Sequence, residues 1–175
     1  MTITLGNENS GAIFSNCGKY RFALWRVIED APLLEKLAGD CVFIGLNPSV
    51  ANEEQLDPTT RICRNYTQSW GCKRYVMLNV FSWIDSDPAA MKRAIEPIGP
   101  DTSRIIKEFC RNARTIVACW GTHATYLQRE KAVLEMLRPY DLYCLKLTAG
   151  GHPHHPTRME TIASPLLWKP KSRSP

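Results

Sequence analysis

Four apolar runs of the sequence end in polar side chains that could bind or activate a ligand. The ends read Gly45-Leu46-Asn47-Pro48-Ser49, Leu78-Asn79-Val80-Phe81, Trp120-Gly121-Thr122-His123 and, from Gly150 to Pro156, GGHPHHP. Amides and imidazoles recognise a ligand by hydrogen bonds or stabilise charge that develops during a reaction. Turn chemistry can account for any one of these ends. Its recurrence at four ends predicts one shared site.

Two asparagines are the first candidates. Asn79 lies inside the apolar run 75–83, where an unpaired amide would cost about 1–3 kcal/mol. We therefore expect a fixed partner, which is either a polar group in the core or the edge of a nucleobase, whose adjacent donor and acceptor a carboxamide can match. Asn47 cannot be a strong general base, because an amide does not accept a proton near neutral pH. It can orient a water molecule or a sugar.

The histidines of GGHPHHP lie on a loop that glycines open and prolines stiffen. A histidine held there can donate to an oxygen that gains charge in a transition state, an effect of about 10²–10³ in rate. The alternative is a surface loop that happens to be rich in histidine.

The elements that position these groups follow from the spacing of apolar residues. Apolar runs predict buried strands at 41–46, 75–83, 115–121 and 141–148, and an alternating run predicts a half-exposed strand or hairpin arm at 19–28. Asp-Pro starts and glycine or proline stops predict helices from Asp57 to Gly71 and from Asp87 to Pro97. Further helical patterns cover 32–40, 101–113, where Asp101 is the expected cap, and 123–139.

Strands that alternate with helices predict an α/β fold with three layers, in which helices cover a central, mainly parallel four-stranded sheet. In open parallel sheets, ligands bind outside the carboxyl ends of the strands. The four polar ends are therefore expected at one edge of the sheet.

Length and composition indicate one globular domain over residues 1–168, followed by a basic, disordered tail at 169–175. No run approaches the roughly 18 apolar residues of a membrane span. The amino-terminal residues lack the basic and apolar segments of a secretory signal, which predicts a cytoplasmic protein without membrane partners. The net charge of +5 is compatible with a polyanionic partner.

The seven cysteines contain no closely spaced pair, so we expect reduced thiols and no metal. Cys119 stands inside a strand and is a poor nucleophile candidate. No glycine-rich phosphate loop precedes a helix, which argues against a nucleoside triphosphatase or a dinucleotide enzyme. No cofactor is predicted.

The four motifs, in this order, resemble those of the uracil-DNA glycosylase superfamily. GLNPS is similar to the first motif of its mismatch-specific branch, MLNV to the strand whose asparagine reads the pyrimidine edge, CWGTHA to the following Trp-Gly turn, and HPHHP to its His-Pro loop. The chain also resembles a bacterial and phage family of uncharacterised proteins near that superfamily, through Asp57 to Arg61 and Gly151 to Pro156. The resemblance spans about residues 40 to 160.

The resemblance implies roles for several residues. Asn47 would position water, and either His155 or His152 would stabilise the departing base. Asn79 would read the base beside Gly45. Tyr66 and Trp70 are candidates for an aromatic residue that stacks on an extruded base, or else helix-face core residues.

The sequence departs from the superfamily in two places. The water-activating carboxylate of its efficient members is absent from the first motif, and Asp57 is the nearest substitute. Arg158 and Met159 stand where an apolar wedge for duplex DNA would be expected.

Contacts with a nucleic-acid backbone are predicted for polar and basic residues near the motifs, or these residues form an ordinary solvated face. They are Ser49, Arg61, Arg64, Lys73, Arg74, Thr122, His123 and Arg158.

We therefore expect a DNA glycosylase-like protein that hydrolyses the N-glycosidic bond of a damaged or modified base in DNA. One alternative is a non-catalytic module that recognises a base or a nucleic acid. Another is an enzyme that acts on nucleosides or nucleotides.

Overall fold

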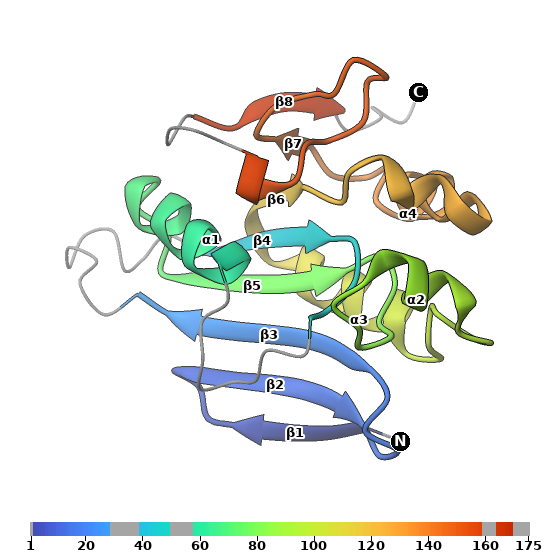
Figure 1. Cartoon of the computed structure of the whole chain (residues 1–175). Coiled ribbons are helices and arrows are strands. Elements are labelled where there is room, and N and C mark those ends of the chain that lie inside the picture. Colours follow the sequence, from blue (N-terminus) through green and yellow to red (C-terminus); the bar gives the residue numbers. More distant parts are fainter. Residues whose placement is uncertain (1, 29–38, 50–57, 159–163, 170–175) are drawn as a thin grey trace.

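The computed structural model describes residues 2–28, 39–49, 58–158 and 164–169, which form one eight-stranded mixed sheet flanked by four α-helices (Figure 1). The strand order is β1-β2-β3-β5-β4-β6-β7-β8. The strands are β1 (Thr2–Gly6), β2 (Ser10–Ser15), β3 (Arg21–Val27), β4 (Asp40–Gly45), β5 (Arg74–Asn79), β6 (Ala113–Ala118), β7 (Leu142–Cys144) and β8 (Leu166–Lys169).

The predicted four-stranded, mainly parallel sheet is wrong. Parallel pairing joins β5 to β4, β4 to β6 and β6 to β7, whereas the other four of the seven strand pairs are antiparallel. The difference arises at both ends of the chain. Residues 2–27 form a three-stranded meander that pairs with β5 through β3, and β8 pairs with β7. Lys169, predicted to begin the tail, is the last residue of β8.

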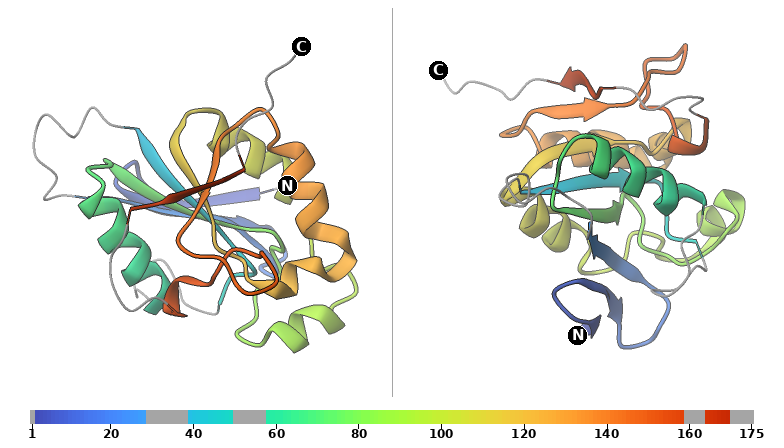
Figure 2. Two further views of the ribbon diagram at one scale, coloured as in Figure 1. Left: turned by 90° about the horizontal axis from the view of Figure 1, so that it is seen from above. Right: turned by 90° about the vertical axis from the view of Figure 1, so that its left-hand side faces the viewer.

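Helices cover both faces of the sheet. The helix α1 (Pro58–Ser69) packs on one face, where Tyr66 and Cys63 join a core with Phe43 of β4 and Met77 of β5. On the other face, α3 (Thr102–Arg111) and α4 (Arg129–Met136) pack in a core with β3 to β7. Seen from above, α1 and α4 lie on opposite sides of the strands (Figure 2).

Helix ends only partly follow the sequence signals. In α2 (Pro88–Arg93) the Asp87 carboxylate accepts hydrogen bonds from the N–H groups of Ala89 and Ala90, as an N-cap should. The expected side-chain cap at Asp101 is absent, because its carboxylate binds Arg104 instead.

The predicted single helix over 123–139 is wrong as well. The segment divides into a 3₁₀ helix, η2 (Thr122–Gln128), and α4. Leu127 and Gln128 adopt φ of 52° between the two, a left-handed conformation that no α-helix contains. The division lets η2 begin at the carboxyl end of β6.

Within the described residues, no helix has the length and apolar character needed to cross a membrane. The predicted helical turn at 32–40 lies largely outside the described residues, as do Asp57 and the end of the tail.

Candidate functional site

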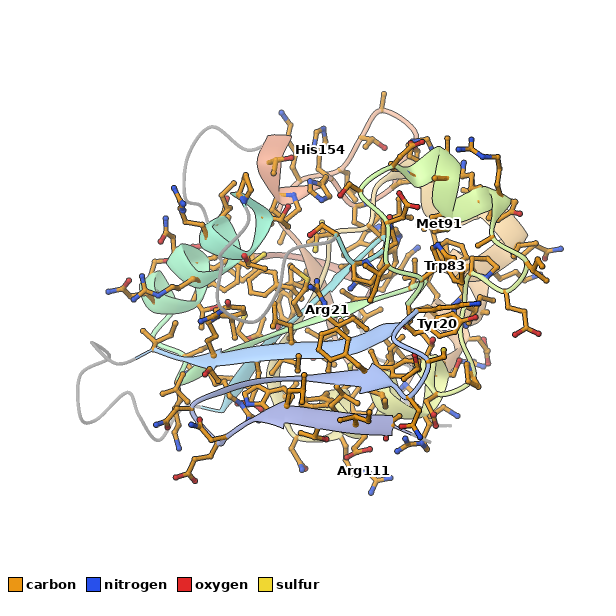
Figure 3. All side chains as sticks on the ribbon, turned by 60° about the horizontal axis from the view of Figure 1, so that its bottom comes forward. Tyr20, Arg21, Trp83, Met91, Arg111 and His154 are labelled. Carbon is orange, nitrogen blue, oxygen red and sulfur yellow. The ribbon has the colours of Figure 1, made fainter. Side chains whose placement is uncertain are left out.

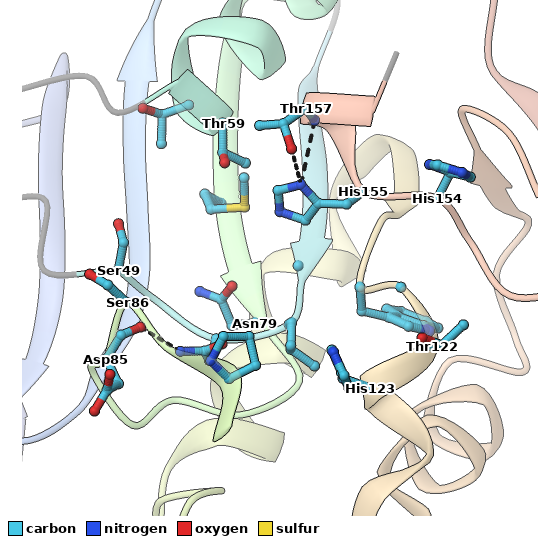
Figure 4. Close-up of a pocket in the computed structure, with 18 of the residues that line it drawn as sticks. Ser49, Thr59, Asn79, Asp85, Ser86, Thr122, His123, His154, His155 and Thr157 are labelled. Atoms are coloured by element: carbon cyan, nitrogen blue, oxygen red, sulfur yellow. Dashed lines mark hydrogen bonds between the residues drawn. The ribbon is translucent and has the colours of Figure 1, made fainter. Parts of the chain in front are cut away.

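A cavity of about 510 Å³ opens where β4, β5 and β6 end (Figure 4). Its walls come from β3, the segments after β4, β5 and β6, the start of α1 and the loop after β7. The lining residues are Arg21, Gly45, Leu46, Asn47, Ser49, Thr59, Thr60, Met77, Asn79, Asp85, Ser86, Pro88, Trp120, Gly121, Thr122, His123, Thr148, His154, His155 and Thr157. Polar ends of the four apolar runs therefore meet in one place.

Asn79 is the last residue of β5 and lines the cavity. The residue is 5% exposed, yet its carboxamide forms no hydrogen bond within the part of the chain that the structure describes. Gly45 is its Cα partner on β4, and a Cβ there would lie 2.9 Å from Asn79 Oδ1. The missing side chain at Gly45 thus leaves room for the carboxamide beside the cavity.

Asn47 is held by the loop that follows β5. Its Nδ2 donates a hydrogen bond of 2.7 Å to the carbonyl oxygen of Asp85 and a longer one of 3.4 Å to that of Pro48. The Asp85 N–H in turn donates to the Pro48 carbonyl oxygen. The donor side of the Asn47 amide is therefore occupied, and Oδ1 is the atom that can accept a hydrogen bond from water or a sugar hydroxyl.

His155 lines the cavity in a defined tautomer. The backbone N–H of Thr157 donates to its Nδ1 at 3.4 Å, and Thr157 Oγ1 lies 2.8 Å from the same atom. Because Nδ1 accepts, the proton of the neutral ring is on Nε2. His155 also has a further interaction within the chain.

The structure does not bring His152 to the cavity wall. Its Nδ1 lies 2.8 Å from Oε2 of Glu130, and Oε1 of the same carboxylate accepts from the indole Nε1 of Trp120 at 2.9 Å. Trp120 is buried and does line the cavity. The prediction of His152 as a group in contact with the base therefore needs correction: Glu130 holds its ring behind the cavity wall.

Sequence reasoning missed His154 as an individual candidate. It lines the cavity, and its Nδ1 is buried without a hydrogen-bond partner among the described residues. Its backbone N–H donates to the Lys146 carbonyl oxygen, which fixes the loop at this point. It is one of three histidines in the GGHPHHP loop, and nothing in the local sequence indicates which of the three faces the cavity.

Arg21 is the second residue that sequence reasoning missed. It lies at the start of β3 beside Tyr20 (Figure 3), is 3% exposed and lines the cavity. Ile13 pairs with Ala23 but Phe14 pairs with Arg21, so Phe22 is the extra residue of a β-bulge. Phe22 and Ala23 both join the core under α3 and α4. The bulge thus breaks the strand's alternation and turns Arg21 to the cavity.

Tyr66 is a buried core residue, Trp70 is half-buried against the same core, and neither lines the cavity. The Trp70 ring stacks on Phe43 at 5.9 Å between centroids and meets Tyr66 at 5.0 Å. Both rings face the sheet because this is the side of α1 that packs on β4 and β5. Their positions fit the alternative that they are core residues on the face of α1, and neither ring lines the cavity.

The predicted backbone-contact residues fall into separate groups. Ser49, Thr122 and His123 line the cavity, and Nζ of Lys92 lies 3.1 Å from His123 Nδ1. Lys73 and Arg74 lie at the opposite end of β5, where Arg74 forms a bidentate salt bridge with Asp40. The remaining positions are Arg61, exposed on α1, Arg64, half-buried on α1, and Arg158, whose side chain is outside the described residues, as is all of Asp57.

The cavity offers no thiol nucleophile among its described lining residues. Cys119 lies at the end of β6, but burial raises the pKa of its thiol to about 12, and Sγ donates to the Ile44 carbonyl oxygen. Within the described ranges, no group of three or more His, Cys, Asp or Glu residues could hold a metal ion. The groups available among the described lining residues are amides, imidazoles, hydroxyls, one guanidinium and the carboxylate of Asp85.

Comparison with known proteins gives a family but no activity. Residues 21–157 match a family described as "Protein of unknown function (DUF1643)". Every residue that lines the cavity falls within this range. No curated protein and no solved structure matches the chain.

Proposed function

We propose, for a chain that belongs to the protein family of unknown function DUF1643, that the cavity binds a nucleobase and hydrolyses its N-glycosidic bond in DNA. The observation that carries the proposal is the unpaired carboxamide of Asn79 at the cavity. The carboxamide lines the cavity, so a ligand bound there would meet both its donor and its acceptor.

A nucleobase is the ligand that best suits this amide. Pyrimidines and purines present a donor and an acceptor side by side, which a carboxamide can match with two hydrogen bonds. Gly45 leaves the approach to Oδ1 open. Met77 and the Trp120 ring supply apolar surface at the same cavity, and its volume lies within the range typical of small-molecule sites.

The other cavity residues support hydrolysis of the bond between base and sugar. A water oxygen would bond to the sugar C1′ while the C1′–N bond breaks, and the base would leave with that electron pair. The proton lost by the water would pass to the base or to solvent. Asn47 Oδ1 suits the orientation of the water, and the Nε2–H of His155 suits donation to a base oxygen that gains negative charge.

Extrusion of a base from DNA would precede this step and costs a few kcal/mol, least for a damaged, mismatched or single-stranded base. Ser49, Thr122 and His123 at the cavity suit contact with the adjoining sugar-phosphate backbone. A cytoplasmic site of action is part of the proposal.

One observation favours a second candidate, a non-catalytic module that recognises a base. Asp85 is the only acid among the described residues that line the cavity, and its Oδ1 accepts a hydrogen bond from the Asp87 N–H. A base-binding site with weak activation of water would bind without cleavage.

The test is an abasic-site assay on labelled single- and double-stranded oligonucleotides that carry uracil, mismatched thymine, hypoxanthine or bulky modified pyrimidines. Release of a base by the wild-type protein, with loss of release in Asn79→Ala and in His155→Ala, would establish the glycosylase. Binding that depends on Asn79, without release of any base, would establish the recognition module. Neither binding nor release would refute both.

A further inference from the structure

A second cavity, of about 390 Å³, lies between α4 and the strands β7 and β8, at one end of the strand order. None of the described residues that line it also lines the first cavity. Its volume is within the range typical of small-molecule sites. Recognition of a nucleobase in the first cavity makes no use of the second.

Three leucines form the apolar floor of the second cavity. Leu134 of α4 and Leu137, three residues later, share one side of the helix, and Leu142 is the first residue of β7. Leu137 and Leu142 are buried, and Leu134 is half-buried against the same core. An apolar group placed on this floor would remove leucine surface from water, which favours binding.

Two exposed lysines line the second cavity beside this floor. Lys131 lies three residues before Leu134 on α4, and Lys169 of β8 is the Cα partner of Leu142. Within the described ranges neither lysine forms a salt bridge. Nζ of Lys169 lies 5.2 Å from the centroid of the Trp168 ring. One ammonium group thus comes from the helix and the other from the strand.

Both acids that line the second cavity already have partners. Oε1 of Glu130 accepts from the indole Nε1 of Trp120 at 2.9 Å, and Oε2 lies 2.8 Å from His152 Nδ1, with the side chain only 13% exposed. Glu135 forms an exposed salt bridge with Arg138, in which Oε1 and Nη1 are 3.5 Å apart. The charges of this pair offset each other, so the two lysines leave the cavity positive.

We propose that the second cavity binds a small amphipathic carboxylate, a molecule with an apolar chain or ring and one carboxylate group. The apolar part covers the leucine floor, and the carboxylate accepts hydrogen bonds from the ammonium groups of Lys131 and Lys169. A neutral molecule of the same shape leaves both lysines unused, and an amine is repelled by them. The inference goes beyond the proposed function and does not depend on it.

Calorimetry on the full chain tests the inference with four probes: octanoate, octanol, octylamine and acetate. We expect octanoate to bind about fivefold more tightly than octanol, and by a smaller factor at high salt, because ion pairs with exposed lysines are modest and are screened by salt. Octylamine should bind more weakly than octanol. Acetate, which lacks the apolar part, should show no detectable binding. Equal affinities for octanoate and octanol, or no binding of octanoate, would overturn the inference.

Variants of the two lysines test how the carboxylate is bound. Lys131→Gln and Lys169→Gln should each weaken octanoate and leave the affinity for octanol unchanged, since each removes one positive charge beside the floor. The matched control is Lys107→Gln, which removes the same charge from an exposed position of α3 that lines neither cavity. An equal loss of octanoate affinity in all three variants would show an effect of net charge and contradict the site.

Two further variants test where the apolar part binds. Leu134→Asn places an amide on the floor and should weaken octanoate and octanol alike, by on the order of tenfold. Asn79→Ala changes the first cavity and should leave both affinities unchanged. Loss of octanoate binding in Asn79→Ala, with none in either lysine variant, would place the ligand in the first cavity and refute the inference. The lysine variants change exposed side chains, so they decide the question even if Leu134→Asn does not fold.

Discussion

Gly45 and Asn79 are the final residues of the adjacent parallel strands β4 and β5, and the absence of a side chain at Gly45 makes room for the Asn79 carboxamide. A Cβ at position 45 would lie 2.9 Å from Asn79 Oδ1, closer than such contacts occur in proteins. The position of the Asn79 carboxamide at the end of β5 thus depends on glycine at the end of β4.

Gly45→Ala should therefore weaken ligand binding through Asn79. The new methyl group displaces the carboxamide. We therefore expect the affinity for base-containing probes to fall about tenfold, which corresponds to the loss of one hydrogen bond. The measurement is calorimetry with the base-containing oligonucleotide that the wild-type protein binds most tightly. Gly39→Ala is the control, because the nearest atom to its Cβ lies at an ordinary 3.5 Å. Unchanged affinity in Gly45→Ala would contradict the dependence.

Asn79→Leu should abolish binding without loss of stability. Leucine has a similar size and removes an amide that lacks partners, so the free energy of unfolding should stay equal or rise by about 1 kcal/mol. Urea denaturation measures it. The contrast is Ser82→Ala, which removes the acceptor of a buried hydrogen bond from Thr102 Oγ1 and should destabilise by about 1 kcal/mol. A marked destabilisation in Asn79→Leu would show that the amide has a structural partner.

Substitution of His155 should lower the rate of base release, whereas substitution of His152 should lower stability. His155→Ala removes a donor at the cavity and should lower the rate of base release by about 10²-fold with little change in stability. His152→Ala leaves Glu130 with one partner fewer beneath Trp120 and should cost about 1–3 kcal/mol of unfolding free energy. Single-turnover assays and thermal denaturation on both variants decide. The opposite pattern would move the working group to His152.

Cys17 should be the fastest thiol to react in the native protein. It is exposed, whereas the other six cysteines are buried. A hydrogen bond with Ser15 lowers the pKa of the Cys17 thiol below the ordinary 9.0, so its thiolate, the reactive form, should appear at lower pH than in a model thiol. Burial raises the pKa of Cys110 and Cys119 to about 12, which keeps both protonated. Titration with a chromogenic disulfide across pH 6 to 9, roughly the range that brackets a free thiol, follows the rate.

Cys17→Ser is the control for this titration. It should remove the fast phase and leave the slow phases that require opening of the core. A fast phase that persists in Cys17→Ser would place a second reactive thiol at the surface.

The polar ends of the strands could be read from the sequence because apolar runs mark buried strands and polar residues mark where they leave the core. Asn47, Asn79, His123 and His155 lie at one cavity for this reason. Their roles in binding and catalysis stay predictions.

The sheet as a whole could not be read in this way. β3 pairs with β5, and β8 pairs with β7, although other segments separate these strands in the sequence. The residues of a short strand do not indicate which strand it will pair with. The prediction of a four-stranded sheet failed at these two edges.

The residue types at the strand ends could be assigned from local patterns, since periodicity and strand termination are local properties. Which of these residues share the cavity depends on how the segments pack together. A bulge in β3 turns Arg21 inward, Glu130 holds His152 behind the wall while His154 and His155 line it, and packing on β4 and β5 takes Tyr66 and Trp70 into the core. Each of these outcomes depends on contacts between distant segments, which local patterns do not encode.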